Sequence, residues 1–534
     1  MDMVADNTRL AGQSNTSWTV EHLGQGSSPS AVFLAKDGGA FFAKGVAYSP
    51  VPIGGSFHYT PQVGDWFHGP WTIIAARDMP MMRALGLNFV RTYAFWWWQV
   101  TTDLQVMRTL DQSSPITTTG TEPFDERTGF FSALEENGVY SLIGVALDGG
   151  NVFDGGSDAV RFAYGNFYLQ TAEKLAREYG DEPSVMGFCL ANEQNQAARN
   201  TRADVWAYYF LMKQRVQRGL GSNKKLVSIA WQNDADLYNG THTVDLSDAN
   251  IATLPAANGS GDTEIDLQQA ARDLRAALVG GPPADLTTVP VEQIISTICD
   301  VWGLNIYAGM GDSLQHFDAH VFQTPYARPL LVTEWGHAGT ENHPASAVGP
   351  IAGNAGLVEQ DSTGMKTAAD GIDSDIAAMQ GYLKFVSGGT YFEWTDEWWK
   401  NDSFWDAIPQ SQQDYLNEQI SAWKPGAPPP TYQLDAAGKI TFNSGQTGYP
   451  QYTFVWDGSA NQAWPEEGWG LQSVAPNGRQ AWDNPWNVSA NQPYPADVLI
   501  ERTMLLDALL GRAGAYVNKG YPMLETAYEQ LMNS

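Results

Sequence analysis

Two stretches of the chain share one pattern: Ser184-Val-Met-Gly-Phe-Cys-Leu-Ala-Asn-Glu193 and Pro329-Leu-Leu-Val-Thr-Glu-Trp-Gly336. Each contains a short apolar run that ends at a glutamate, Glu193 in the first and Glu334 in the second. An uninterrupted apolar run of this length predicts a strand covered on both faces, and the carboxyl ends of such strands form the active site of a (β/α) barrel. A single glutamate of this kind would be interpreted as a surface loop residue. Two in equivalent positions indicate an acid and a nucleophile.

Similar apolar runs recur along the chain, and helical patterns lie between them. The runs cover residues 40–47, 88–93, 139–147, 185–190, 226–230, 301–306, 330–333 and 389–394. The helical patterns cover residues 72–85, 167–179, 202–220, 264–278 and 373–386. Alternating strands and helices form a parallel sheet, and eight strands is the number that closes a TIM barrel. The predicted fold class is therefore α/β, a (β/α)8 TIM barrel with its eight strands within residues 40–400.

The alternation of strands and helices stops after residue 400. Residues 401–493 are rich in Pro, Gly, Asn and Trp, and a helical pattern returns at 496–510. The simplest interpretation is that this late helix closes the barrel and that 401–493 is an insertion on the catalytic face. The alternative is a small β-rich accessory unit that begins near residue 426. Residues 1–39 are then an N-terminal lead-in, and 494–534 hold the closing helix and the C-terminal tail.

The composition argues against several kinds of partner. The 534 residues include 59 acidic and 30 basic ones, and the formal charge of −29 is unsuited to nucleic acid. No apolar stretch is long enough to insert into a membrane. The two cysteines, Cys189 and Cys299, lie in apolar surroundings and suggest free buried thiols. Neither a metal-ligand cluster nor a glycine-rich phosphate loop occurs, so we expect no metal and no cofactor.

Several motifs resemble one known group of enzymes. Asn192-Glu193 and Thr333-Glu334-Trp335-Gly336 are similar to the strand ends of the retaining glycoside hydrolases that are built on (β/α)8 barrels. Within that clan, three stretches resemble the β-1,3-glucanases and β-1,3-glucanosyltransferases: Phe41-Phe-Ala-Lys-Gly-Val-Ala-Tyr48, Gly303-Leu-Asn-Ile-Tyr307 and Glu393-Trp-Thr-Asp-Glu-Trp-Trp-Lys400. The similarity covers roughly residues 40–400.

The resemblance implies roles for the residues that match these motifs. Glu193 would be the acid/base and Glu334 the nucleophile of a double displacement, with carboxyl groups about 5 to 5.5 Å apart. Asn192 would bond the sugar 2-hydroxyl, and Tyr307 would contact Glu334. Arg91 would hold Glu334 in its charged form, because a guanidinium beside a carboxylate favours ionisation. The alternative for Arg91 is a purely structural ion pair.

Other candidates for substrate binding follow the remaining strands. Trp394 would form a floor under the sugar, with a ring partly exposed in the empty enzyme, unless it is ordinary packing. Asp148 and Asn233 would bond hydroxyls or, equally, cap loops. At least one ring of the Trp96-Trp97-Trp98 triplet should reach the cleft, because consecutive side chains of a strand point to opposite faces. The remaining candidates are Tyr93, Glu397 and Lys400.

The function predicted is hydrolysis of a β-linked glucan, most simply a β-1,3-glucan, and the partner is an oligo- or polysaccharide. Alternatives are another β-linked polysaccharide such as a mannan or galactoside, and glucanosyl transfer, although the chain lacks the paired catalytic-site cysteines of the fungal transglycosylases. The non-enzymatic alternative is an inactive carbohydrate-binding barrel. A secreted or periplasmic location is expected, even though the Met-Asp-Met-Val-Ala-Asp start lacks the features of a signal peptide.

Overall fold

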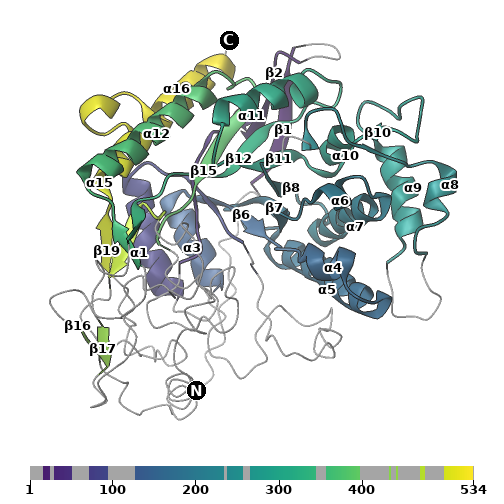
Figure 1. Cartoon of the computed structure of the whole chain (residues 1–534), viewed down its shortest axis with the longest axis horizontal. Coiled ribbons are helices and arrows are strands. Elements are labelled where there is room, and N and C mark those ends of the chain that lie inside the picture. Colours follow the sequence, from purple (N-terminus) through teal and green to yellow (C-terminus); the bar gives the residue numbers. More distant parts are fainter. Residues whose placement is uncertain are drawn as a thin grey trace.

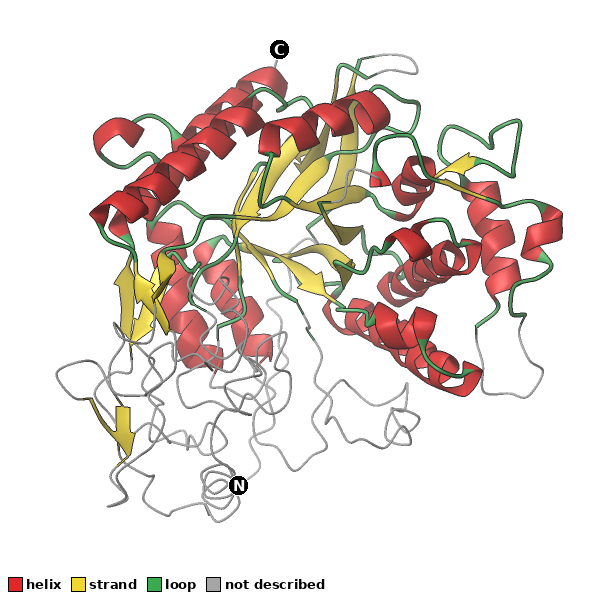
Figure 2. Cartoon of the chain, viewed as in Figure 1, coloured by secondary structure: helices red, strands yellow, loops and turns green. Residues whose placement is uncertain are grey.

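The computed structural model describes residues 16–24, 29–50, 71–93, 95, 127–233, 237–256, 265–343, 356–396, 432–434, 440–442, 469–475 and 498–532. Eight parallel strands form a closed barrel at the centre of this structure, with helices around it (Figures 1 and 2). The strands are β4 (Ala43–Ala47), β5 (Phe89–Arg91), β6 (Tyr140–Gly144), β7 (Val185–Asn192), β8 (Leu226–Gln232), β11 (Val301–Asn305), β12 (Leu330–Trp335) and β15 (Val386–Tyr391).

The predicted (β/α)8 TIM barrel is confirmed, and each of the eight apolar runs supplies one strand. The strands follow one another around the barrel in chain order, and β15 closes it against β4. Most strands differ from their predicted bounds by a few residues at one or both ends. The eighth strand is shifted as a whole, because it runs from Val386 to Tyr391 and not from residue 389 to 394. Residues 393–396 leave the barrel and bond to residues 469–472 instead.

The amino-terminal residues cover the end of the barrel opposite the carboxyl ends of the strands. They form an antiparallel sheet of β1 (Trp18–Leu23), β2 (Ala31–Lys36) and β3 (Gly39–Ala40). The Trp18 amide donates to the Lys224 carbonyl oxygen just before β8, and the Val32 amide donates to that of Lys384 just before β15. Trp18 is 1% exposed and packs with apolar side chains from inside the barrel.

Helices between the barrel strands form the outer layer. They are α1 (Trp71–Ala84), α3 (Arg127–Asn137), α4 (Gly149–Asp154), α5 (Asp158–Tyr179), α6 (Ala197–Asn200), α7 (Ala203–Leu220), α8 (Asp248–Ile251), α9 (Leu267–Ala277), α10 (Val291–Ile298), α11 (Met310–Phe317), the π-helical turn η2 (Asp318–Phe322) and α12 (Ser362–Gln380). The apolar positions alone placed the start of α5 too late, because Ser157 caps it by accepting from the Val160 amide. For α12 the predicted range 373–386 is wrong at both ends. Asp361 caps its start, and Val386 already belongs to β15.

Short strands lie in the connections outside the barrel. They are β9 (Thr243–Val244), β10 (Val289–Pro290), β13 (Thr340–His343), β14 (Gly356–Glu359), β16 (Tyr432–Leu434), β17 (Ile440–Phe442), β18 (Gln472–Ala475) and β19 (Val498–Glu501), and they pair in four antiparallel hairpins or ladders.

The prediction that 401–493 forms an insertion on the catalytic face falls mostly outside the described residues. Of that range, the structure describes 432–434, 440–442 and 469–475.

The helix that closes the barrel is not the predicted one. Residues 498–501 of the predicted helix form strand β19, and α15 (Thr503–Leu510) packs against α12. The closing position is taken by α16 (Gly520–Met532), with η5 (Gly514–Tyr516) before it. Tyr521 donates to the carbonyl oxygens of Gly45 in β4 and Gly389 in β15, at 3.2 and 2.8 Å. Helix α16 therefore spans the seam where the last strand meets the first.

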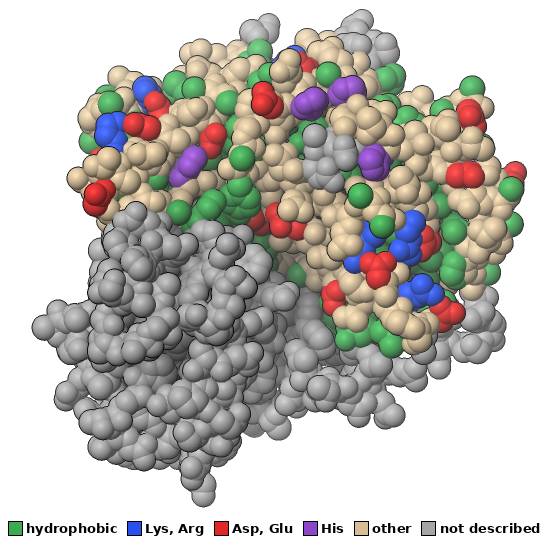
Figure 3. Space-filling view, in the orientation of Figure 1, with side chains coloured by type: hydrophobic (Ala, Val, Ile, Leu, Met, Phe, Trp, Pro, Cys, Tyr) green, Lys and Arg blue, Asp and Glu red, His purple; other side chains and the backbone are tan. Residues whose placement is uncertain are grey.

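On the face shown in Figure 3, basic side chains are few and lie beside acidic ones. Among the described residues, Arg202 pairs with Asp154 and Asp204. The described part of this face therefore carries no continuous basic patch. Within the same described residues, no helix has the length and apolar character that crossing a membrane requires.

Buried tyrosines of α16 make a pH-dependent contribution to stability. Tyr528 is 0% exposed and donates to Ser387 in β15 at 3.2 Å, and burial raises its pKa above the usual range. A folded-state pKa above the unfolded value of about 10 gives stability that is complete below pH 10 and is lost as pH rises further. We expect the free energy of unfolding, measured with urea at pH 9 to 11, to fall less steeply in Tyr528→Phe, by up to about 1.4 kcal/mol per pH unit.

The matched control for this experiment is Phe42→Leu. The Phe42 ring packs 5.2 Å from that of Tyr528, so this change disturbs the same contact without removing an ionisable group. It should lower stability equally at each pH. A wild-type slope retained in Tyr528→Phe would contradict the assignment.

Candidate active site

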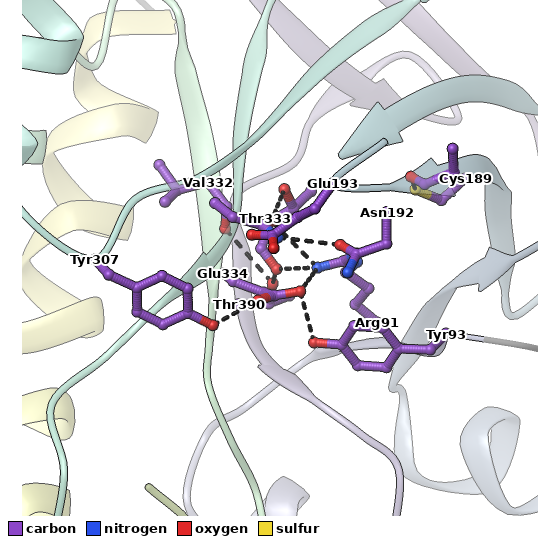
Figure 4. Close-up of polar contacts among 12 residues, drawn as sticks. Arg91, Tyr93, Cys189, Asn192, Glu193, Tyr307, Val332, Thr333, Glu334 and Thr390 are labelled. Carbon is purple, nitrogen blue, oxygen red and sulfur yellow. Dashed lines mark hydrogen bonds and ion pairs between the residues drawn. The ribbon is translucent and has the colours of Figure 1, made fainter. Parts of the chain in front are cut away.

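Glu334, at the carboxyl end of β12, accepts hydrogen bonds on both carboxylate oxygens (Figure 4). Arg91 Nη1 and the Tyr93 hydroxyl donate to Oε1 at 2.6 and 2.9 Å. The Tyr307 hydroxyl donates to Oε2. Glu334 is only 4% exposed. A buried carboxylate held by a cation and two hydroxyls is fixed in orientation and balanced in charge. The predicted contacts of Arg91 and Tyr307 with Glu334 are confirmed.

Arg91, the last residue of β5, links three other strands of the barrel. Besides Glu334, Nη1 donates to the Thr333 carbonyl oxygen of β12 at 2.9 Å, and Nη2 donates to Asn192 Oδ1 of β7 at 2.6 Å. Nη1 also lies 3.4 Å from Asn305 Oδ1 of β11. Burial alone would lower the pKa of Arg91, but the nearby Tyr93 and Glu334 outweigh burial and raise it, so the guanidinium keeps its charge.

Glu193 directly follows β7 and has an unusual backbone conformation. Its φ of +52° lies in the left-handed region, which side-chain-bearing residues seldom adopt. Its amide donates to the Ala230 carbonyl oxygen of β8 at 2.9 Å. On its carboxylate, Oε1 accepts from Asn305 Nδ2 at 2.8 Å. Backbone strain of this kind persists where the surroundings hold it, and it is common at functional sites.

Asn305, the last residue of β11, lies at the centre of this hydrogen-bond network. The sequence motif Gly303–Tyr307 contains it, but no role was predicted for it. Its Nδ2 donates to both Glu193 and Asn192, and its Oδ1 accepts from Thr333 Oγ1 at 2.8 Å. Its position at the end of an apolar run was the signal that could have identified it. The Asn305 side chain therefore bonds Glu193 directly and is linked to Glu334 through Thr333, the residue before it.

Asn192 is oriented by two donors. Its Oδ1 accepts from Arg91 at 2.6 Å and from Asn305 at 3.0 Å. This arrangement directs the Nδ2 amide group away from the network, and Nδ2 makes no hydrogen bond to any described residue. A donor in that position is suited to a ligand hydroxyl.

Aromatic rings surround Glu334. Phe392, directly after β15, lies 6.4 Å from the ring of Tyr93 and 6.1 Å from that of Tyr307, both in edge-to-face geometry. The Trp469 ring lies 5.0 Å from that of Tyr307. Sequence reasoning gave Phe392 no role, because it placed the end of the eighth strand at Trp394. The observed register places Phe392 against the site instead.

The expectation that the Trp394 ring is partly exposed is wrong. Trp394 is 0% exposed and belongs to the main apolar core. Its backbone is held between Ala47 and Gln472, with the Trp394 amide donating to the first carbonyl oxygen and the Gln472 amide donating to that of Trp394, both at 3.1 Å. The physical reason is that β15 ends earlier than predicted. Residue 394 therefore lies in the packing layer between the barrel and residues 469–472.

This burial changes what replacement of Trp394 should do. We expect Trp394→Ala to lower the free energy of unfolding by about 3 to 5 kcal/mol, because it leaves a large cavity in the core. Urea unfolding measures the change. The catalytic efficiency of the fraction that remains folded should change less than the stability does. A variant with wild-type stability would show that the ring is not part of the core.

The remaining candidates have other surroundings. Asp148 caps α4, accepting from the amide and side chain of Asn151 at 3.1 and 2.6 Å. Asn233, after β8, donates to the Ala308 carbonyl oxygen at 3.2 Å and accepts from Ser313 at 3.1 Å. Both side chains therefore make loop-stabilising contacts, as the alternative interpretation of these two residues predicts. Trp97, Glu397 and Lys400 lie outside the described residues.

Arg91 provides a direct test of this network. Arg91→Met leaves the Glu334 carboxylate buried without its cation, which is expected to lower the free energy of unfolding by about 3 to 5 kcal/mol. It should also lower kcat by roughly 10²-fold, as loss of a buried electrostatic contact does. Calorimetry and steady-state kinetics measure the two effects. Arg161→Met is the control, because its ion pair with Asp158 is solvent-exposed and should contribute less than about 1 kcal/mol.

Across the described ranges, no three His, Cys, Asp or Glu side chains lie together in an arrangement that could hold a metal ion. Cys189 and Cys299 are both free and buried, which confirms the prediction made for them.

Comparisons with known proteins give partial similarity. No family model matches the chain. The chain is 25% identical over 173 residues to the 1,3-beta-glucanosyltransferase GAS5 of Saccharomyces cerevisiae, a match that covers 32% of this chain and 28% of that protein. The chain thus spans less than a third of the length of this curated relative.

The similar solved structures include a β-glucuronidase from Ruminococcus gnavus, with a TM-score of 0.40, 13% identity, and coverage of 71% of this chain and 46% of that one. Another is β-glucuronidase 2 of Bacteroides uniformis, with a TM-score of 0.37, 13% identity, and coverage of 68% and 32%. Likeness at this level carries no conclusion about function, and the barrel assignment rests on the strand order itself.

Proposed function

We propose that this protein is a retaining glycoside hydrolase that cleaves a β-linked glucan, with Glu193 as the acid/base and Glu334 as the nucleophile. The observation that carries the proposal is the joint placement of the two carboxylates. Glu193 directly follows β7 and Glu334 lies at the carboxyl end of β12. The Arg91, Asn192 and Asn305 side chains connect them at the carboxyl end of one barrel. Two carboxylates on either side of a glycosidic bond are what such cleavage requires.

The different partners of the two glutamates support the division of roles. Glu334 accepts from a guanidinium and two hydroxyls, which suits a group that must attack as an anion. Glu193 accepts from the neutral Asn305 amide, which suits a group that gives and then regains a proton. Surroundings that treat two carboxyl groups differently are the usual basis of an acid and a nucleophile in one site.

The mechanism follows from these positions. In the first step the Glu334 carboxylate attacks the anomeric carbon while Glu193 protonates the departing glycosidic oxygen, giving a glycosyl ester on Glu334. In the second step Glu193 takes a proton from water, which attacks the same carbon and releases Glu334. In this proposal the Nδ2 donor of Asn192 bonds a hydroxyl of the sugar during both steps.

We further propose β-1,3-glucan as the substrate, and glucanosyl transfer as the second candidate. The support is the partial similarity to a 1,3-beta-glucanosyltransferase, together with the three sequence stretches noted above. The two activities differ only in whether water or a sugar hydroxyl attacks the ester. A secreted or periplasmic location is part of the same proposal, since glucan polymers are its substrate.

Proton NMR of the products tests the proposal. The protein is incubated with β-1,3-glucan, β-1,4-glucan, β-mannan and β-galactan oligosaccharides, and the first anomer released is recorded. We expect the β anomer from the β-1,3-linked substrate, as carboxyl groups about 5 to 5.5 Å apart predict. Products longer than the substrate would indicate transfer. Initial release of the α anomer would contradict retention, and turnover confined to mannan or galactan would contradict the glucan assignment.

A further inference from the structure

The described chain returns to the carboxyl end of the barrel late in the sequence. Residues 469–472 lie beside residues 393–396, which follow β15. The Leu471 amide donates to the Glu393 carbonyl oxygen at 2.8 Å, and Thr395 forms a parallel bridge with Gln472. This pairing brings Trp469 to the nucleophile's side of the barrel.

Trp469 contacts the group that holds the nucleophile. Its ring lies 5.0 Å from that of Tyr307 at an interplanar angle of 79°, and 6.5 Å from that of Phe392. The Tyr307 hydroxyl in turn donates to Glu334. The Trp469 side chain remains partly exposed.

A buried ion pair fixes the residue next to Trp469. Arg502 donates through Nη1 and Nη2 to the two oxygens of Asp396 at 2.5 and 2.8 Å, and the two side chains are 3% and 0% exposed. Arg502 Nη1 also donates to the Gly470 carbonyl oxygen, and the Gly470 amide donates to Asp396 Oδ1 at 3.0 Å. Both backbone polar groups of Gly470 are thus bonded to this pair.

Two glycines make room for the pair. A Cβ atom at position 470 would lie 2.4 Å from the Asp396 nitrogen, and one at position 339 would lie 2.4 Å from Arg502 Cδ. Both distances are shorter than real Cβ contacts, so neither position accepts a side chain without displacing the pair. The ion pair and the path of the chain at Gly470 therefore depend on each other.

A buried ion pair is seldom more stabilising than apolar residues of the same size. The position of the Gly470 backbone, which this pair holds, therefore explains the pair better than a gain in stability does. We propose that Trp469 is a substrate-contacting residue of this site and that Asp396 and Arg502 form the positioning pair that holds it against Tyr307. The inference rests on the proposed function, because it takes a sugar as the ligand. The C–H face of a sugar ring is apolar enough to pack on an indole, and the ring wall excludes water from the carboxylates.

Steady-state kinetics on the glucan that the wild type cleaves best tests this inference. Trp469→Ala should raise KM about tenfold, with kcat changed less, as loss of one aromatic contact predicts. Asp396→Asn and Arg502→Met should raise KM similarly when assayed well below their melting temperatures. The double variant Asp396→Asn/Trp469→Ala should show the same KM as Trp469→Ala alone. The ion pair affects KM only by holding the Trp469 side chain, which the double variant lacks.

Arg215→Met is the matched control. It breaks the buried pair with Glu173 between α5 and α7, away from the carboxylates, and should lower the melting temperature without changing KM. A wild-type KM in Trp469→Ala, or in a folded Asp396→Asn, would overturn the inference while leaving the proposed function standing. Additive effects in the double variant would overturn the positioning role. A wild type that turns over none of the glycans would contradict the proposed function and the sugar-contacting role together.

Discussion

Replacing Glu334 by glutamine is expected to reduce kcat by about 10⁴-fold or more, because it removes the only atom proposed to bond the anomeric carbon. The amide has the same shape as the carboxylate and can still accept from Tyr93, so the barrel should fold and bind sugar. Steady-state kinetics gives the loss of turnover. Titration calorimetry with an oligosaccharide and thermal unfolding check that binding and fold persist.

Glu292→Gln is the matched control for this variant. Glu292 is also a buried carboxylate, 1% exposed, and accepts from the Gly240 amide at 2.6 Å. Burial raises its pKa, so a neutral amide replaces it at little cost in stability. Its activity should match the wild type. If Glu334→Gln retained turnover within tenfold of the wild type, Glu334 would not be the nucleophile.

Replacing Glu193 by glutamine should have an effect that depends on the leaving group. A sugar hydroxyl leaves slowly unless it is protonated, so kcat/KM on the glucan should fall by about 10² to 10⁴-fold. A dinitrophenyl glycoside of the same oligosaccharide needs no protonation to leave, and its kcat/KM should stay within about tenfold of the wild type. The comparison of the two substrates in one variant serves as its own control.

The second step offers an independent check on Glu193. Without a base to activate water, the glycosyl ester on Glu334 should accumulate when the dinitrophenyl substrate is used, and mass spectrometry of the intact protein would detect it. Azide attacks without giving up a proton and should restore turnover. Equal losses on both substrates, with no effect of azide, would remove Glu193 from the acid/base role.

Much of this site could be predicted because its residues close apolar runs. A run of four to eight apolar residues between helices identifies a barrel strand from local composition alone. The residue that follows it must then lie at the carboxyl end of the barrel, where all eight strand ends meet. Glu193 and Glu334 were found in this way, and the resemblance to the glycoside hydrolases added Arg91 and Asn192. The structure brings all four together in one network.

Register at the end of a strand could not be predicted in the same way. The stretch Gly-Gly-Thr-Tyr-Phe-Glu-Trp predicts a strand that ends at residue 391 as well as one that ends at residue 394. The choice decides whether Phe392 or Trp394 packs against the rings of Tyr93 and Tyr307. Pairing of β15 with β12, which shifts register twice between Leu330 and Trp335, settles that choice in favour of Phe392. Strand pairing is a long-range contact, which local periodicity does not contain.

Patterns within a few residues were thus enough to predict the barrel, the number of its strands and the carboxylates at their ends. Which helix closes the barrel and which aromatic rings line the site depend instead on contacts between distant parts of the chain. Helix α16 is the closing helix because Tyr521 and Tyr528 bond to β4 and β15, and Trp469 reaches Tyr307 because Asp396 pairs with Arg502. In each case the partners lie about a hundred or more residues apart, and only packing in three dimensions selects them.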